Sequence, residues 1–559
     1  MANARYDAIV VGAGHNGLVC AAYLSRAGWK TVVVERNEKI GGAVMSGEVT
    51  RPGFVHDLYS MNQNLFLASP VYAELKEDLE RHGLRYKTSP KPYSNVFPDG
   101  KSLRVYNDQE RTMRLLRDHS PEDAEGFERL YERFEAFGKA FLPIYGMPLP
   151  SAEALWDLVK AARSQGLNEL ADLAQIILSS TRELGDAYFS TPEMKALVAT
   201  WGMHMDFGPD ISGGAMFPFM ETFADMEAGM SVVEGGASRM PEALASLTRE
   251  NGGEVRTESE VARILTEDGR ATGVELASGE RIMASRAVVA NLTPKVLFER
   301  LVDEGVVSPR FRRRVKRYQH GPGTMMVHLA LSSRLRWAAE GDDLDEFAYV
   351  HIPPYVEDLS RTYTASMNGH LPESPLLIVG QTSAVDPSRA PDEGEVLWIQ
   401  VRTLPSEIRG DAAGEIGART WEEAKQPVAD RVMAKLEEYA PGVGEQVLDR
   451  TVFSPADLER QNPNLAGGDS IGGSFHLRQN FVFRPFPGFS NYKMPVEDLY
   501  MVGAATWPGP GTNATSGYLA AKKILRKDAM RATLLKGGAA AGALGAAALA
   551  ARRLARSGR

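Results

Sequence analysis

The chain has 559 residues, enough for two or three domains, and its 43% hydrophobic and 24% charged content is that of an ordinary globular protein. Its net charge of −9 argues against general nucleic-acid binding, so no nucleic-acid partner is expected. Cys20 is the only cysteine, which excludes intramolecular disulfides and the Cys-x-x-Cys centre of a disulfide reductase. We expect Cys20 to be a small buried apolar residue.

A nucleotide-binding βαβ unit is predicted at the start of the chain. Residues 8–11 form an apolar run typical of a strand buried on both faces. Gly12, Gly14 and Gly17 follow with the spacing G-x-G-x-x-G. The first glycine permits a tight turn, the second lets backbone approach a pyrophosphate, and the third lets the next helix pack on the strand. That helix is predicted over residues 16–26, with its N-terminal N–H groups facing the phosphates.

The second strand, over residues 31–34, ends at Glu35, where a carboxylate can bind ribose hydroxyls. The glycine spacing alone is a weak signal, but the strand, helix, second strand and acidic residue occur in the required order. Because Glu35 would repel a 2′-phosphate, FAD or NAD is favoured over NADP.

Arg36, Gly41 and Gly42 extend this pattern. They resemble the extended FAD fingerprint of glutathione reductase-like and amine oxidase-like flavoproteins, in which a basic residue and a Gly-Gly turn follow the acidic strand end. Ala43 stands where that fingerprint usually has an arginine. The resemblance implies FAD as the cofactor.

The middle of the chain is predicted to be largely helical. Ser120 is a predicted N-cap, followed by phenylalanines at helical spacing, and residues 151–205 are expected to be helical throughout. Residues 201–230 mix methionines with aromatic residues, which is consistent either with packed core or with the wall of a flexible hydrophobic substrate channel. His204 lies in this segment and is more often a structural group in such a place.

Two later segments return to the cofactor. Residues 232–291 contain a glycine pair, an apolar helix and several strands, and they resemble the second FAD segment of amine oxidase and carotenoid desaturase flavoproteins, in which the residue matching Val261 meets the adenine. Residues 296–490 are strand-rich, with a long amphipathic helix over 421–439. The strand at 499–502 then enters a glycine turn and a helix over 516–525. In this third segment the predicted FAD-binding residues are Gly503, Ala504, Gly511 and Thr512.

Taken together, these segments resemble the bacterial phytoene desaturase family, and within it the carotenoid ketolase and phytoene dehydrogenase-related branch. Besides the glycine loop with His15 and Asn16, the resemblance rests on the stretches 463–469, 483–488 and 499–511 and on Gln479. It implies an α/β fold: a Rossmann-like FAD-binding domain of the glutathione reductase and amine oxidase type with a discontinuous α+β substrate domain. The FAD-binding domain is assigned to residues 1–90, 225–295 and 491–530, the substrate domain to 91–224 and 296–490, and a basic tail to 531–559.

The family implies FAD-dependent hydride removal, by desaturation or oxygenation, from a long apolar polyene or isoprenoid such as a carotenoid, in a dry apolar tunnel. Oxygen or a quinone would reoxidise the flavin. No metal site is expected, and the sequence names no catalytic acid or base. The positions to inspect, each more typical of a structural role, are His56, Asp57, His204 and Trp507.

Two alternatives stay open: a flavin amine oxidase, and a low-turnover flavin-containing interaction protein held at a membrane. We expect a cytoplasmic protein, because the first strand begins by about residue 6 and no segment offers ~20 consecutive apolar residues. The basic Ala/Gly-rich tail over 531–559 is consistent with a surface tail or with peripheral contact to an anionic membrane. Substrate identity, the direction of the reaction and the oligomeric state do not follow from the sequence.

Overall fold

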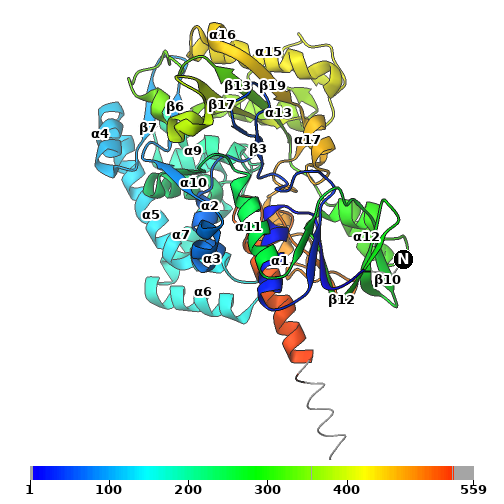
Figure 1. Ribbon diagram of the computed structural model, residues 1–559. Coiled ribbons are helices and arrows are strands. Elements are labelled where there is room, and N and C mark those ends of the chain that lie inside the picture. The colour runs from blue at the N-terminus through cyan, green and yellow to red at the C-terminus, as the bar shows by residue number, and fades with distance from the viewer. Residues whose placement is uncertain (1–3, 354, 532, 534–559) are drawn as a thin grey trace, which may run out of the picture.

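Two seven-stranded β-sheets organise the computed structural model, which describes residues 4–353, 355–531 and 533. Figure 1 shows helices α1 (His15–Arg26) and α11 (Arg239–Glu250) beside the first sheet, to the left of β12 and β10, and the second sheet in the upper half of the view. A group of helices lies along the left side of the view.

The first sheet, here called the cofactor sheet, has the strand order β10-β11-β12-β1-β2-β9, and β20 pairs with β12. Strands β12, β1, β2, β9 and β20 run parallel, whereas β10 and β11 form an antiparallel extension. Each strand comes from one of the three segments predicted for the FAD-binding domain. The strands are β1 Ala4–Val11, β2 Thr31–Val34, β9 Glu254–Arg256, β10 Val261–Glu267, β11 Arg270–Leu276, β12 Arg281–Ala290 and β20 Leu499–Met501.

Helices α1 and α11 pack against each other on one face of the cofactor sheet. Their apolar positions, including Leu18 and Leu244, are fully buried in one hydrophobic cluster with the inward side chains of β1 and β2. Cys20 lies in the same cluster, with no exposed surface, which confirms the prediction made for it. The Asp268–Gly269 turn joins β10 to β11, as their antiparallel pairing requires.

The second sheet, here called the substrate sheet, has the order β19-β13-β17-β16-β14-β6-β7. All of its pairings are antiparallel except that of β14 with β6. Helix α15 (Trp421–Tyr439), which has the predicted bounds, packs on one face. The strands are β6 Tyr93–Val96, β7 Ser102–Val105, β13 Gly323–Leu331, β14 Tyr349–Ile352, β16 Leu377–Gln381, β17 Glu395–Leu404 and β19 Val447–Phe453.

The central strand β17 shows how the two faces of the substrate sheet differ. Leu397, Ile399 and Val401 point into the core beneath α15. Because side chains alternate along a strand, the intervening residues point to the opposite face. That face carries Gln400 and Arg402, so it is partly polar although it lies inside the molecule.

Helices cover this inner face. The side chain of Ser120 caps α5 by accepting a hydrogen bond from the N–H of Asp123 at 3.2 Å, as predicted. Residues 151–205 are helical apart from short breaks at which serine, threonine or glycine precedes the next helix. The helices of this layer are α4 Gln109–His119, α5 Pro121–Tyr145, α6 Ala152–Gln165, α7 Leu167–Leu178, α8 Thr181–Tyr188, α9 Pro192–Met203 and α10 Met216–Ala228.

Smaller elements join these layers. The strand pairs are β3 Ser46–Gly47 with β4 His56–Asp57, β5 Tyr86–Ser89 with β8 Met230–Val233, and β15 His370–Leu371 with β18 Gly410–Asp411. The remaining α-helices are α2 Asn64–Leu67, α3 Pro70–Arg81, α12 Pro309–Lys316, α13 Val356–Met367, α14 Thr382–Val385, α16 Val443–Gln446 and α17 Pro455–Gln461.

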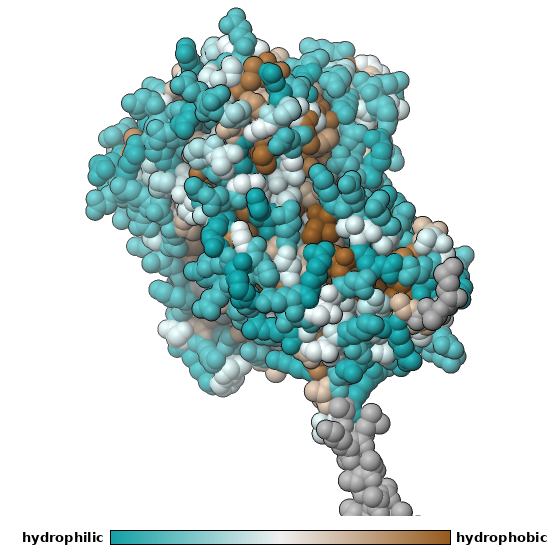
Figure 2. Space-filling view, in the orientation of Figure 1, coloured by the Kyte–Doolittle hydropathy of each residue, from teal (hydrophilic) through white to brown (hydrophobic). Residues whose placement is uncertain are grey.

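The face shown in Figure 2 is mostly hydrophilic, with hydrophobic residues gathered in a band down its middle. Within the described part of the chain, no helix combines the length and hydropathy needed to cross a membrane. The predicted last helix runs from Thr515 and continues past Leu525 to Arg531. Almost all of the predicted tail lies outside the described residues, so its membrane contact stays a prediction.

Candidate active site

The glycine loop after β1 packs closely against backbone and against Asn291, while Gly12 and Gly14 also line a cavity. Gly12 has φ +94°, and its N–H donates to the carbonyl oxygen of Val34 at 2.8 Å. A Cβ on Gly17 would lie 2.4 Å from the Gly12 carbonyl oxygen, and one on Gly14 would lie 2.8 Å from Asn291 Nδ2. The loop therefore keeps its tight turn and its open N-terminal edge of α1 only with glycine at these positions.

Glu35 is held rigidly at the end of β2. Its Oε2 accepts the N–H of Ala13 at 2.9 Å and its Oε1 accepts the N–H of Asn37 at 3.0 Å, and the side chain is buried. These two bonds fix the carboxylate beside the glycine loop with acceptor capacity left for ribose hydroxyls. The exposed Arg36 lies next to it, with Nε 3.9 Å from Glu260 Oε1.

The Gly-Gly turn folds back over the glycine loop. The Gly41 N–H donates to the carbonyl oxygen of Ala13 at 2.9 Å. Gly41 and Gly42 have φ of +125° and +64°, and a Cβ on Gly42 would lie 3.2 Å from the Cα of Gly14. The turn thus closes one side of a cavity at the carboxyl ends of β1, β2 and β12, where open α/β sheets bind their ligands.

This cofactor cavity brings together residues from all three predicted FAD segments, with the loop over residues 462–472 as its far wall. Gly17 and Gly41 do not line the cavity, but each packs so closely on neighbouring backbone that a Cβ would lie 2.4 Å from a carbonyl oxygen. Gly511 and Thr512 line the chamber that adjoins the cavity. The predicted cofactor residues that line the cavity itself are Gly12, Gly14, Glu35, Arg36, Gly42, Val261, Gly503 and Ala504.

The adjoining chamber, here called the substrate chamber, lies between the inner face of the substrate sheet and helices α9 and α10. It shares Leu465, Ser470 and Ala504 with the cofactor cavity, so the two spaces meet. His15 also lines both, and burial lowers its pKa to about 4, so the ring is neutral at pH 7. The hydrophobic side chains of the chamber include Met61, Leu65, Trp201, Met205, Phe217, Met326, Trp398, Leu458 and Ile471.

Arg402 is the main departure from the apolar tunnel expected from the sequence. Its Nε donates to Gln400 Oε1 at 2.6 Å and its Nη1 to Ser470 Oγ at 2.6 Å. Among the described residues it has no carboxylate oxygen within 4.0 Å. Desolvation lowers its pKa to about 10, so the guanidinium remains charged at neutral pH. A positive charge without an anionic partner therefore lies where the chamber and the cofactor cavity meet.

Glu221 supplies a second polar group to the chamber wall. It is on α10, one turn before the buried Asp225, whose Oδ1 accepts from Asn64 Nδ2 at 2.7 Å. Burial raises the pKa of Asp225 to about 7 and that of Glu221 well above its ordinary value, with the Asp225 charge raising Glu221 further. Burial therefore favours the protonated form of Glu221, which can donate a hydrogen bond into the chamber.

The positions singled out for catalysis separate into two groups. His204 lines the chamber, where burial lowers its pKa and its Nε2 has no hydrogen-bond partner among the described residues. The other three are structural: Asp57 pairs with the buried Arg389 at 3.1 Å, His56 bonds Thr50 Oγ1 at 2.7 Å, and Trp507 Nε1 donates to the Met147 carbonyl at 2.8 Å.

Residues 201–230 divide between packed core and the lining of the chamber, so their role as a substrate channel stays a prediction. Met203, Met216 and Met226 are buried in the largest hydrophobic cluster. Trp201 and Met205, by contrast, line the chamber. Sequence reasoning missed Glu221, Gln400 and Arg402, although the two polar residues Gln400 and Arg402, spaced two apart in the apolar strand β17, were a visible signal.

The glycine loop, the fixed Glu35 and an adjoining chamber with many apolar side chains are the features of a flavoprotein oxidoreductase. The described fold is that of a Rossmann-like cofactor domain with a mixed α/β substrate domain. Residues 17–428 match the family model described as "Flavin containing amine oxidoreductase", and the chain belongs to that family. The family and the cavity together identify FAD as the cofactor, as predicted.

Several named proteins are similar over nearly the whole chain. "Pyridine nucleotide-disulfide oxidoreductase domain-containing protein 2" of Rattus norvegicus is 29% identical, over 93% of this chain and 94% of that protein. A limonene dehydrogenase subunit of Castellaniella defragrans is 28% identical, over 93% and 94%. "Phytoene desaturase (neurosporene-forming)" of Cereibacter sphaeroides is 26% identical, over 94% and 95%.

Solved structures agree on the fold. An oxidoreductase from Methanosarcina mazei superposes with a TM-score of 0.60 at 17% identity, covering 93% of this chain and 99% of that chain. A putrescine oxidase variant gives a TM-score of 0.59 at 15% identity, covering 94% and 99%.

Proposed function

We propose that this protein is an FAD-dependent oxidoreductase that removes hydride from a C–H bond of a lipophilic, isoprenoid-type substrate. The observation that carries the proposal is the substrate chamber, which adjoins the cofactor cavity and is lined chiefly by methionine, aromatic and aliphatic side chains. Such walls bind hydrocarbon by burial and keep water from the reacting carbon. The similarity to a limonene dehydrogenase and to phytoene desaturases supports the same substrate class, carotenoids included.

The polar groups of the chamber fit a reaction in which hydride leaves carbon for the cofactor and a proton leaves the substrate. When bound, FAD supplies a two-electron acceptor for hydride. Arg402 places a positive charge where the chamber meets the cofactor cavity, and this charge favours the transfer of electrons to the cofactor. Neutral His204 can accept the proton released when the carbon chain forms a new double bond, or when water adds to give an alcohol.

An anaerobic single-turnover experiment tests this proposal. The FAD-loaded protein is mixed with a cyclic monoterpene, a linear C40 polyene, a long-chain alkane and a primary amine, and loss of the oxidised flavin absorbance is followed. We expect bleaching with an isoprenoid and none with the alkane, whose C–H bonds give no stabilised cation. Bleaching by the amine alone would refute the proposal.

Amine oxidation is the second candidate, and Glu221 is the observation that favours it. A carboxylate in an apolar chamber can pair with a substrate ammonium group. Arg402 in the same chamber opposes it, because its positive charge has no counter-ion among the described residues and repels a second cation. The amine arm of the experiment above decides between the two.

A further inference from the structure

A cluster of cations without acidic partners lies outside the active site. Helix α12 and the residue after it read Pro-Arg-Phe-Arg-Arg-Arg-Val-Lys-Arg over 309–317. Within the described ranges, no carboxylate oxygen lies within 4.0 Å of any of these basic groups, although the chain has a net charge of −9. The same holds for two neighbours, Lys295 and Arg478. Unpaired cations gathered in an acidic protein form a local positive field that attracts anionic partners.

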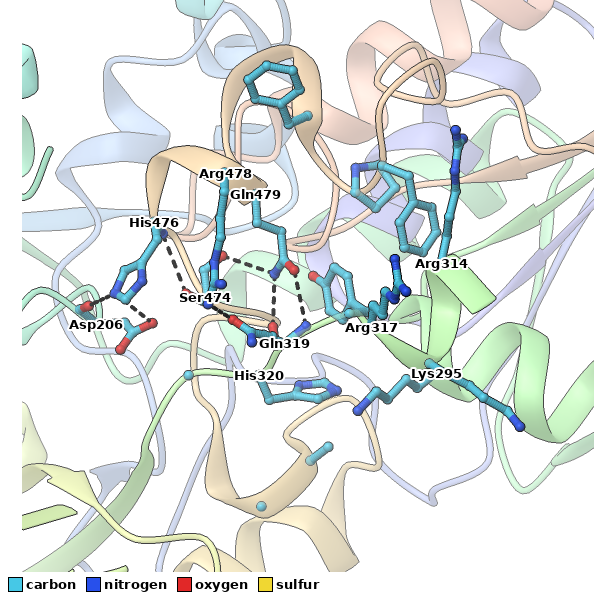
Figure 3. Close-up of a pocket in the computed structure, with 18 of the residues that line it drawn as sticks. Asp206, Lys295, Arg314, Arg317, Gln319, His320, Ser474, His476, Arg478 and Gln479 are labelled. Atoms are coloured by element: carbon cyan, nitrogen blue, oxygen red, sulfur yellow. Dashed lines mark hydrogen bonds and ion pairs between the residues drawn. The ribbon is translucent and has the colours of Figure 1, made fainter. Parts of the chain in front are cut away.

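Several of these cations line one groove, here called the basic groove (Figure 3). Lys295, Arg314 and Arg317 lie on one side of the view, and His476 with Asp206 on the other. Asp206 is already engaged, since its backbone carbonyl accepts from His476 Nε2 at 2.8 Å and its Oδ1 accepts from the Tyr363 hydroxyl at 3.1 Å. The groove therefore has no free carboxylate among its described lining residues.

The groove also has an apolar part. Met367 is 56% exposed and Phe483 is 44% exposed, and both line it together with Pro485 and Pro487. Exposed apolar residues with charged residues around them are the usual anatomy of a protein–protein contact.

One loop separates the basic groove from the cofactor cavity. Leu465, Ser470 and Gly472 line the cavity, whereas Ala466 and Gly467 of the same loop line the groove. Lys295 likewise stands beside Thr293, which lines the cavity. A molecule seated in the groove would therefore lie against the outer wall of the FAD site.

We propose that the basic groove docks an acidic electron-carrier protein that reoxidises the flavin, and this rests on the proposed FAD-dependent oxidation. Each turnover leaves two electrons and one proton on the cofactor, as the transferred hydride, and one proton on His204. Two molecules of a one-electron carrier take up the electrons, and the two protons are released to solvent. Contacts of this kind are small, charge-steered and short-lived, which suits a carrier that must leave after each transfer.

The spread of charge favours a protein over a small anion. Arg310 and Arg313 are exposed on α12 outside the groove, and Lys316 and Arg317 are exposed at its rim. A single phosphate would use two or three of these groups, whereas an acidic protein surface meets all of them.

Binding is measured first, without any turnover. FAD-loaded protein is titrated with oxidised flavodoxin and with a [2Fe–2S] ferredoxin, both small and acidic, at low and high salt. We expect binding that weakens steeply with salt, and a Kd raised about tenfold in the Lys316→Glu/Arg317→Glu variant. The matched control is Arg129→Glu/Lys139→Glu on α5, which changes the net charge equally and should leave the Kd unchanged.

Electron transfer is measured next, starting from photoreduced protein so that no substrate is needed. We expect anaerobic carrier reduction to slow about tenfold in the groove variant alone, while reoxidation by oxygen is unchanged. Salt-independent carrier binding, or equal loss in both double variants, would overturn the proposal. So would binding of phosphatidylglycerol vesicles that is lost in the groove variant while neither carrier binds. A failed substrate panel with intact carrier docking would count against the proposed function only.

Discussion

The cofactor cavity and the substrate chamber adjoin each other, yet they are built in different ways. The cavity is made largely of backbone, with Gly12, Gly14 and Gly42 as its cradle and one fixed carboxylate, Glu35. The chamber is made of side chains from separate elements, with an arginine and a buried glutamic acid among apolar walls. A backbone site recognises a constant ligand, whereas a side-chain site can be adapted to a particular substrate.

The comparison predicts that changes in the cavity remove the cofactor, while changes in the chamber leave FAD bound and alter chemistry or stability.

The largest effect is expected for Gly17→Ala. The new methyl carbon would lie 2.4 Å from the Gly12 carbonyl oxygen, so β1 and α1 must separate. We expect a loss of about 3 kcal/mol in stability, from overpacking, together with loss of FAD. Cofactor content after gel filtration and thermal unfolding measure the two effects. The control is Gly138→Ala on α5, where the nearest atom would be 3.6 Å away, and helix propensity predicts a small gain. A Gly17→Ala protein that keeps its FAD would show that the loop does not need glycine at this position to bind the cofactor.

Arg402→Met is expected to slow flavin reduction about 100-fold while FAD remains bound, because a preorganised positive charge between the chamber and the cofactor cavity is lost. The reduction potential of the bound cofactor should fall as well, which a purely structural residue would not cause. Arg402→Lys should recover part of both. Arg450→Met, on β19 of the same sheet but paired with Asp430 at 2.9 Å, is the control. Release of FAD from the Arg402→Met variant would contradict the expectation that changes in the chamber leave the cofactor bound.

These two residues show what the sequence could and could not predict. Gly17 belongs to a local pattern in which strand, turn and helix follow one another within 30 residues, so its role can be predicted from spacing. The role of Arg402 depends on Ser470 and on α10, which lie near it only because distant segments pack together. Local periodicity identifies a strand at 395–404 but does not indicate what its inner face meets.

The basic groove could likewise be predicted only in part from the sequence. The arginines of α12 are visible in the sequence, but Lys295 and Arg478 join them only in the fold. The alternation of Trp398, Gln400 and Arg402 was a local clue to a polar inner face. The proximity of this face to the cofactor cavity depends on three-dimensional packing.

Glu35→Gln is a smaller change in the cofactor cavity than Gly17→Ala. The amide keeps the size of the side chain, but the Ala13 and Asn37 N–H groups lose a charged acceptor. We expect FAD to bind about tenfold more weakly, which corresponds to about 1.4 kcal/mol. Recovery of flavin fluorescence on dilution measures the release. Glu38→Gln, an exposed neighbour, should bind FAD normally. Unchanged affinity in Glu35→Gln would mean that this carboxylate only orders the turn.

Glu221→Gln should give the smallest effect, on stability and with a defined pH dependence. Burial raises the folded-state pKa of Glu221 well above the value of about 4.3 in the unfolded chain. Between the two pKa values the folded state binds more protons than the unfolded state, so stability falls as pH rises through this range. Glutamine carries no titratable proton, so the variant should match the native protein near pH 4 and exceed it by about 1 kcal/mol near pH 8. Asp225, with a pKa of about 7, leaves a residual slope in both proteins. Urea unfolding at a series of pH values measures the difference, with the exposed Glu125→Gln on α5 as control. A pH profile parallel to that of the native protein would show that Glu221 is charged in the chamber, and would reopen the case for a substrate ammonium group.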